Sequence, residues 1–284
     1  MYKLELSSVS YLYSRGTPFE KEALSQVSVG FEAGKITGIL GHTGSGKSTL
    51  AQLLNGLLPP TEGKVYLDGK DIWENPKELS KVRYRVGLVM QYPEYQLFDE
   101  TVEADIGVAP RNMGLSPEEI RERVNQAASF VGLTEDLLKK SPLDLSGGQK
   151  RRAALAGIIA MRPEVLVLDE PAAGLDPKGK KEIFRGLCRY KEKLNATVLI
   201  VSHSMEDMAL YCDNIVVMKE GGVLTSGSVG KVFSQPEHLL QSGLDLPGVY
   251  RLALGLRENG IALDGNLYTV DGVYQAVKNA LKSY

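Results

Sequence analysis

The chain has 284 residues, enough for one large domain with an appendage or for two modest domains. Its 33 basic and 35 acidic residues leave a net charge of −2, so no overall basic field attracts nucleic acid. No apolar run approaches the roughly 18–20 residues that cross a bilayer, and the first residues lack the apolar core of a signal peptide. These properties predict a cytoplasmic protein that reaches a membrane only through a partner.

The N-terminal half begins with strands. Residues 1–34 alternate apolar and polar side chains, which predicts antiparallel strands joined by a loop over residues 14–20. Further on, the helical insertion has its clearest start at Ser116, a capping residue followed by acids in the first turn. The other elements expected in this half are a buried strand over 36–40, a helix over 49–57, a short strand and Asp-Gly turn over 63–69, a strand over 86–90 and the helical insertion over 101–140.

The second half alternates helices with strands, and beyond residue 235 the pattern becomes mixed and ends in an amphipathic helix. This alternation predicts an α/β fold with a mainly parallel sheet that helices cover on both faces. Cys188 and Cys212 lie in predicted helices without metal-ligand spacing, which favours two buried free thiols. The expected elements are helices over 148–160 and 179–193, strands over 165–168, 198–201 and 215–218, and a hairpin after the last strand.

A phosphate-binding loop lies between the buried strand and the first helix, since the residues from Gly41 fit G-x-x-x-x-G-K-[ST]. Glycines let backbone N–H groups turn around phosphates, and the following helix directs its positive end at the same charge. Lys47 is expected to reach the β- and γ-phosphates of ATP or GTP, and Ser48 to ligate Mg²⁺. A chance glycine-rich turn is the alternative, which the matching flanks disfavour. The predicted nucleotide-binding residues of the loop are Gly41, His42, Thr43, Gly44, Ser45, Gly46, Lys47, Ser48 and Thr49.

Two acids follow the apolar strand over 165–168. A parallel strand delivers the residues at its end to the carboxyl edge of the sheet, beside the phosphate loop. We expect Asp169 to hold Mg²⁺ in its second shell and Glu170 to orient or deprotonate the attacking water.

A second glycine-containing turn, Leu145–Arg152, opens the helix over 148–160. Backbone N–H groups at such a turn can bind an anion, although an ordinary helix cap has the same composition. One chain has little use for two triphosphate cradles, so we expect this turn to face the nucleotide of another subunit. Its predicted nucleotide contacts are Ser146, Gly147, Gly148 and Gln149.

These three stretches together resemble the ATP-binding subunit of an ABC transporter. The resemblance implies the ABC type of P-loop ATPase fold, with an N-terminal antiparallel β subdomain, a helical subdomain over about residues 92–160 and a small C-terminal appendage. It divides the chain into an ATPase domain, residues 1–235, and a C-terminal domain, residues 236–284, as a candidate dimer contact.

The same resemblance assigns three further roles. Gln91 stands where the family has the glutamine that contacts Mg²⁺ and water, and His203 where it has the histidine that touches the γ-phosphate. Tyr13 occupies the place of the aromatic residue that stacks on adenine, although Tyr11 lies on the same sheet face and competes for that role. The implied catalytic residues are therefore Glu170, His203 and Gln91, and the implied metal site contains Ser48, Gln91 and Asp169.

A narrower resemblance concerns the residues after Gln91, together with the phosphate loop, Leu54–Leu58 and the tail after Ser242. They are similar to the energy-coupling-factor type, importers of vitamins and transition metals. This implies a second ATPase subunit, a copy or a paralogue, a transmembrane energy-coupling subunit, a membrane substrate-binding subunit and a peripheral location at the cytoplasmic face of the cell membrane. The loop over 16–20 and the run Gln149–Arg152 are similar to the second of the two ATPase paralogues.

A group of acids surrounds the aromatic pair Tyr92 and Tyr95. A solvated helix start would also place acids here. We expect some of them, Glu94 and Asp99 first, to receive arginines from the transmembrane subunit. The group comprises Glu94, Asp99, Glu100, Glu103 and Asp105.

The sequence therefore predicts an ATPase, with ATP and Mg²⁺ as cofactors, that powers micronutrient uptake through ATP-driven closure of an ATPase dimer. A soluble ABC ATPase acting on DNA or ribosomes is the alternative. It would need a long coiled-coil insertion or a second cassette, and the net charge argues against polyanion binding. A metabolic kinase would leave Leu145–Arg152 unexplained.

Overall fold

The computed structural model describes residues 1–241 and 243–282; Ser242 and residues 283–284 of the predicted C-terminal domain lie outside the described residues. The strands are β1 Tyr2–Tyr13, β2 Lys21–Glu32, β3 Ile36–Gly41, β4 Glu62–Leu67, β5 Lys70–Asp71, β6 Val86–Val89, β7 Val165–Asp169, β8 Thr197–Val201, β9 Asn214–Lys219 and β10 Gly222–Ser228. The helices are α1 Lys47–Leu54, α2 Leu79–Arg85, α3 Val102–Ile106, α4 Val108–Asn112, α5 Pro117–Val131, α6 Glu135–Leu138, α7 Gly147–Ile159, α8 Pro177–Leu194, α9 Met205–Tyr211, α10 Val229–Phe233, α11 Pro236–Gln241, α12 Gly248–Glu258 and α13 Val270–Lys282. Short 3₁₀ turns are η1 Pro76–Glu78, η2 Pro93–Gln96 and η3 Pro142–Asp144.

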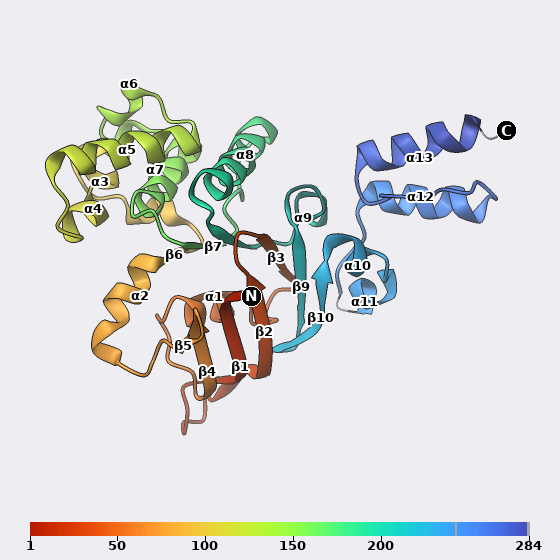
Figure 1. Ribbon diagram of the computed structural model, residues 1–284, viewed down its shortest axis with the longest axis horizontal. Helices are drawn as coiled ribbons and strands as arrows, with labels where there is room; N and C mark the ends of the chain where they lie inside the picture. The colour runs from red at the N-terminus through yellow and green to blue at the C-terminus, as the bar shows by residue number, and fades with distance from the viewer. Residues whose placement is uncertain (242, 283–284) are drawn as a thin grey trace.

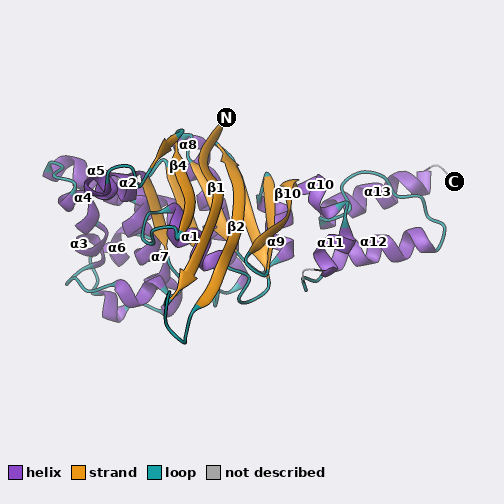
Figure 2. Ribbon diagram, turned by 90° about the horizontal axis from the view of Figure 1, so that it is seen from below, coloured by secondary structure: helices purple, strands orange, loops and turns teal. Residues whose placement is uncertain are grey.

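The N-terminal strands form an antiparallel sheet of order β2-β1-β4-β5, as the alternating pattern predicts (Figure 2). The β1–β2 hairpin ends with Tyr13 opposite Lys21. After β4 the chain reverses at Asp68 and Gly69, which have φ of 52° and 76°. Positive φ at both central residues is the signature of the type I′ turn that Asp-Gly favours, so the predicted turn is confirmed.

The larger sheet has the order β10-β9-β3-β8-β7-β6. Neighbouring strands from β9 to β6 are parallel, and β10 runs antiparallel on the edge. Helices connect the parallel strands, as a parallel sheet requires. The predicted mainly parallel α/β architecture is therefore confirmed.

Both faces of this sheet are buried. Successive side chains of a strand point in opposite directions, so each strand contributes to a core on either face. Leu166 and Leu168 of β7 belong to a core that includes residues of α5, α7 and α8. Val165 and Val167 of the same strand belong to a second core, shared with α1 and the antiparallel sheet. Every residue of β7 is buried, which explains its continuous apolar sequence.

The helical insertion and α7 lie to one side of the sheets (Figure 1). Ser116 caps α5 through a capping box with Glu119, as expected. The insertion is fixed to α8 by a close backbone approach, since a Cβ added to Gly186 would lie 1.9 Å from the carbonyl oxygen of Phe130. Only glycine allows α5 and α8 to come this near.

The C-terminal part extends away from the sheets, with α12 and α13 side by side (Figures 1 and 2). The sequence predicts the last of these helices but not α12. Cys188 and Cys212 are free thiols, half-buried rather than fully buried. Among the described residues, no helix is both long and apolar enough to span a membrane.

Candidate functional site

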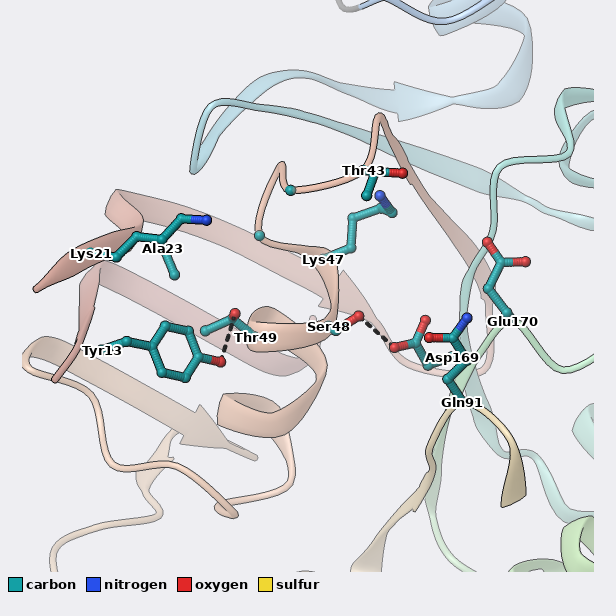
Figure 3. Close-up of a pocket in the computed structure, with 12 residues that line it drawn as sticks. Tyr13, Lys21, Ala23, Thr43, Lys47, Ser48, Thr49, Gln91, Asp169 and Glu170 are labelled. Carbon is teal, nitrogen blue, oxygen red and sulfur yellow. Dashed lines mark hydrogen bonds between the residues drawn. The ribbon is translucent and has the colours of Figure 1, made fainter. Parts of the chain in front are cut away.

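A cavity of about 290 Å³ lies at the carboxyl edge of the parallel sheet, around the N-terminus of α1 (Figure 3). It brings the phosphate loop together with the glutamine after β6 and the two acids at the end of β7. The lining residues are Tyr13, Lys21, Ala23, Thr43, Gly44, Gly46, Lys47, Ser48, Thr49, Gln91, Asp169 and Glu170.

Strand order explains how residues from distant parts of the sequence meet. The strands β3, β8, β7 and β6 are consecutive in the sheet and parallel, so their carboxyl ends share one edge. The phosphate loop, His203, Asp169 and Gln91 follow or end these strands. This is the edge at which open α/β sheets bind ligands.

The phosphate loop has the backbone geometry that its glycines predict. Gly44 and Gly46 have φ of 84° and 98°, and a Cβ on Gly46 would lie 2.6 Å from the carbonyl oxygen of Ala23. Lys47 lies back over the loop, and its Nζ donates to the carbonyl oxygens of Gly41 and His42 at 2.8 and 2.9 Å. The backbone N–H groups of the loop, the Lys47 ammonium and the N-terminus of α1 form a cradle for phosphate oxygens.

Ser48 and Asp169 meet beside this cradle, where Ser48 Oγ donates to Asp169 Oδ2 at 2.6 Å. Burial raises the pKa of the Asp169 carboxyl and lowers the pKa of the Lys47 ammonium, although the two opposite charges counteract both shifts. A hydroxyl, a carboxylate and the nearby amide of Gln91 supply the oxygen ligands that Mg²⁺ prefers. The residues present therefore fit Mg²⁺ bound together with phosphates.

Glu170 follows β7 in a left-handed conformation, with φ of 52°, and its backbone N–H donates to the carbonyl oxygen of Val201. Its side chain is 16% exposed and contacts His203, whose own side chain is 77% exposed. The structure thus pairs two of the three predicted catalytic residues: Glu170 lines the cavity, as Gln91 does, and His203 contacts Glu170 without lining the cavity itself. A carboxylate so placed can accept a proton from a water molecule beside the phosphate loop.

Tyr13, the predicted adenine contact, lines the cavity, and its hydroxyl is hydrogen-bonded to Thr49 Oγ1 at 3.1 Å. Tyr11 instead packs edge-on against Tyr13, with ring centroids 4.8 Å apart. Lys21 and Ala23 of β2 also line this end, although no sequence motif marks them. Their signal is the hairpin register, which places Lys21 opposite Tyr13 and directs residues two apart to one face.

The turn at Ser146 lies elsewhere. Ser146 caps α7 by a capping box with Gln149, and neither lines the cavity of the phosphate loop. Ser146, Gly148 and Gln149 line a separate cavity of about 370 Å³, and Gly147 beside them is exposed. This second cavity is bordered by Gly174 and Asp176 from the segment after β7.

Not every residue of the phosphate loop faces the same cavity. His42 and Ser45 line a recess on another side, with Lys219, Glu220 and Gly243. Gly41 lines neither cavity.

Glu94 and Asp99, which were expected to pair with arginines of a transmembrane subunit, are both paired with arginines of this chain. Arg151 binds both carboxylate oxygens of Glu94, at 2.9 and 3.1 Å, and Arg111 binds Asp99 at 3.0 Å. A third acid of the group, Asp105, accepts hydrogen bonds from the backbone N–H groups of Phe98 and Asp99. These carboxylates are satisfied within the chain, a pairing that sequence spacing did not reveal, while Glu100 and Glu103 are exposed.

Comparison with known proteins identifies the family of the chain. Residues 24–173 match the ABC transporter family. The chain is 46% identical to the energy-coupling factor transporter ATP-binding protein EcfA2 of Caldanaerobacter subterraneus, over 98% of both chains. It is also 46% identical to the EcfA2 protein of Clostridium acetobutylicum, over 99% of this chain and 98% of that protein.

Solved structures give the same result. CbiO1 from Clostridium perfringens, part of the ABC transporter complex CbiONQ, superposes with a TM-score of 0.76 at 40% identity, over 90% of this chain and 99% of that one. A dimeric bacterial ABC transporter cassette superposes with a TM-score of 0.72 at 30% identity, over 80% of this chain and 98% of that one. The chain therefore belongs to the ABC transporter family, as an ATPase among the ATP-binding proteins of energy-coupling-factor transporters.

Proposed function

We propose that the chain is one of two ATPase subunits that close around two ATP molecules and thereby drive an energy-coupling-factor importer. The observation that supports this most directly is the separation of the Ser146 turn from the cavity of the phosphate loop, with no shared lining residue among those described. A capped helix N-terminus with an exposed glycine can bind an anion, and the Ser146 turn lies outside the cavity in which this chain's own phosphate loop would hold a nucleotide. Each nucleotide then lies between one chain's phosphate loop and the other chain's Ser146 turn.

The roles of the site residues follow from their positions. Lys47 and the N-terminus of α1 hold the β- and γ-phosphates. Ser48 and Gln91 would hold Mg²⁺, with Asp169 orienting the Ser48 hydroxyl from the second shell, and the ion would supply charge neutralisation on the phosphate oxygens. Glu170 takes the proton of the attacking water, and His203 keeps the Glu170 carboxylate oriented. Tyr13 stacks on adenine, with Thr49 hydrogen-bonded to its hydroxyl.

Release of the γ-phosphate then removes the contacts that hold the two chains together. Binding energy across the interface favours the closed pair, and hydrolysis removes part of that energy, so the equilibrium returns to the open pair. Closure and opening move the helical subdomain, residues 92–160, relative to the partner subunits.

We assign the docking surface for the transmembrane energy-coupling subunit to the exposed side chains after Gln91. Tyr95 and Phe98 are 84% and 75% exposed, and the exposed Glu100 and Glu103 flank them. Aromatic side chains beside acids suit a joint with an amphipathic, basic helix. Through this subunit the ATPase pair serves a membrane substrate-binding subunit for a vitamin or a transition metal, at the cytoplasmic face of the membrane.

The chain divides into an ATPase domain, residues 1–235, and a C-terminal domain, residues 236–284, as a candidate dimer contact. The net charge of −2 argues against nucleic acid as a partner.

The variant Ser146→Arg tests the shared nucleotide site. It should lower ATP turnover of the assembled pair by about 100-fold or more, since an anion-binding turn is lost and its place is filled. ATP binding to the isolated chain should stay within about twofold, because the turn lies outside its own phosphate cavity. Ser116→Arg is the matched control, since Ser116 caps α5 through the same kind of capping box. Unchanged turnover in Ser146→Arg, or equal loss in the control, would refute the shared site.

A further inference from the structure

Arg151 is a buried arginine near the start of α7, five positions after Ser146. It is 5% exposed and binds Glu94 of η2 through two parallel hydrogen bonds, from Nε and Nη2. The two residues are 57 positions apart in the sequence. Because η2 follows Gln91 directly, this ion pair connects the glutamine of one nucleotide site with the helix that carries the Ser146 turn.

The guanidinium of Arg151 lies close to two further segments. Its Cζ lies 5.9 Å from the centroid of the Tyr92 ring, within the range of a cation–π interaction. A Cβ added to Gly174 would lie 3.9 Å from Nη1, so the segment after β7 passes near the same group. One side chain therefore borders the residues after Gln91, the start of α7 and the segment after Glu170.

The backbone conformation of Tyr92 depends on its contact with Arg151. Tyr92 has φ of 57°, a left-handed conformation that bulky residues adopt only where their surroundings hold them. Its neighbours on either side are Gln91, which lines the phosphate cavity, and Pro93, the buried first residue of η2. Arg151 holds this conformation from two directions, through the Tyr92 ring and through Glu94.

Arginine suits this position better than lysine. A planar guanidinium can make two hydrogen bonds to one carboxylate and still present its face to an aromatic ring. A charge buried to this extent is stable only while its partner stays in place. If Gln91 and η2 change position, movement of α7 with them costs less free energy than separation of the buried Arg151–Glu94 pair.

We infer that Arg151 is a positioning residue that links Gln91 to the Ser146 turn, so that nucleotide bound by one chain alters the turn which that chain offers to its neighbour. The inference rests on the proposed sharing of each nucleotide between two chains. It adds a connection inside each chain between its own site and its contribution to the other site. Such a connection is a coupling between two sites and is measured as a change at one site on binding at the other.

The test uses the double variant Glu94→Gln/Arg151→Met, which removes both charges and leaves no unpaired buried ion. Hydrogen exchange of backbone amides over residues 145–152 is measured in the full-length chain with and without ATPγS, at a concentration where light scattering shows a monomer. In the wild type, ATPγS should change the exchange rates in this segment about fivefold or more, the lower end of ordinary coupling between sites. In the double variant the change should disappear, while the Kd for ATPγS stays within about twofold.

Two further variants complete the design. Arg162→Met is the control, since it removes another Arg–Glu pair of the same region, Arg162 with Glu122, that does not contact η2. It should keep the full exchange response. Arg151→Lys keeps the charge without the paired geometry and should keep only part of the response.

Turnover of the assembled ATPase pair provides the second readout. The double variant should lower kcat by about 5- to 100-fold with little change in KM, since coupling of this size acts after nucleotide has bound. The inference is wrong if the double variant keeps the exchange response, if the wild type has none, or if Arg162→Met loses it equally. Failure of the shared nucleotide site would be seen separately, as unchanged turnover in Ser146→Arg.

Discussion

Nδ1 of His203 lies 2.7 Å from Oε1 of Glu170, so two of the three predicted catalytic side chains are hydrogen-bonded to each other. The carboxylate is mostly buried and the imidazole is mostly exposed. The histidine therefore limits the orientation of the carboxylate and leaves its other oxygen free for a water molecule.

Replacing Glu170 by glutamine keeps the shape of the side chain and removes its basicity. We expect turnover to fall by roughly 100- to 10,000-fold, the range for losing a general base. ATP affinity should remain within about twofold, and the assembled pair should accumulate in a closed form that gel filtration detects. Near-normal turnover would exclude Glu170 as the base.

His203→Ala should lower kcat while leaving KM for ATP nearly unchanged, because the variant removes a group that orients Glu170 rather than one that binds the substrate. His203→Gln retains an N–H donor and should be affected less. Steady-state kinetics of both variants, in the assembled pair, distinguishes the two roles. A rise in KM at constant kcat would instead assign His203 to nucleotide binding.

Asp169→Asn tests the metal site. Ser48 and Asp169 are joined by a 2.6 Å hydrogen bond, so the carboxylate orients the hydroxyl proposed to bind Mg²⁺. Its loss should raise the Mg²⁺ concentration required for half-maximal turnover by about 10- to 100-fold, as for other groups that orient metal ligands. Nucleotide binding in the presence of EDTA should be unaffected, and a Mg²⁺ requirement equal to that of the wild type would remove Asp169 from the site.

Tyr13→Ala and Tyr11→Ala distinguish the two candidates for adenine stacking. Tyr13 lines the cavity, whereas Tyr11 packs against the ring of Tyr13 and is not a lining residue. Tyr13→Ala should weaken ATP binding by about 5- to 150-fold, which corresponds to the loss of one base–aromatic stack. Tyr13→Phe should bind nearly normally, and Tyr11→Ala should weaken binding less. Equal losses in the two alanine variants would contradict the assignment.

An ion network that joins the two sheets predicts how stability depends on pH. Arg85 binds Glu164 through two hydrogen bonds, and Lys3 contributes a third, so the pKa of Glu164 is lowered to about 2. Since this pKa lies below the ordinary value, the network stabilises the fold above about pH 4.5 and loses its effect as the pH falls toward 2. Glu164→Gln should therefore lower the free energy of unfolding at pH 7 by about 1 kcal/mol or less, because the pair is partly exposed.

Chemical denaturation at several pH values measures this effect. The difference between wild type and Glu164→Gln should shrink as the pH falls below about 4.5. Glu32→Gln, a change at an exposed glutamate at the end of β2, is the control and should show little difference at any pH. A difference that stays constant down to pH 2.5 would contradict the ionic origin.

Much of the site was predictable because its signals are local. The loop from Gly41 to Thr49 lies between a buried strand and a helix, and the acids after β7 end a strand that is fully buried. Periodicity specified these elements, and the parallel order of the strands then brought their ends together. The hairpin and its Asp-Gly turn were predictable for the same reason.

Contacts between distant residues were not predictable. Nothing near Glu94 indicates that its partner is Arg151, and the acids after Gln91 therefore suggested a surface for another subunit's arginines. The helix α12 was missed because its sequence, residues 248–258, contains two glycines and no capping side chain. Packing against α13 stabilises it, and a single sequence does not reveal such packing.

The left-handed backbone at Glu170 sets thermal stability against ATP turnover at this position. A side chain in that conformation raises the energy of the native state by about 1 kcal/mol, and glycine would remove this penalty together with the carboxylate. Screening variants of this position for thermal resistance alone would thus favour a glycine, and the most heat-resistant molecules recovered would be those unable to turn over ATP.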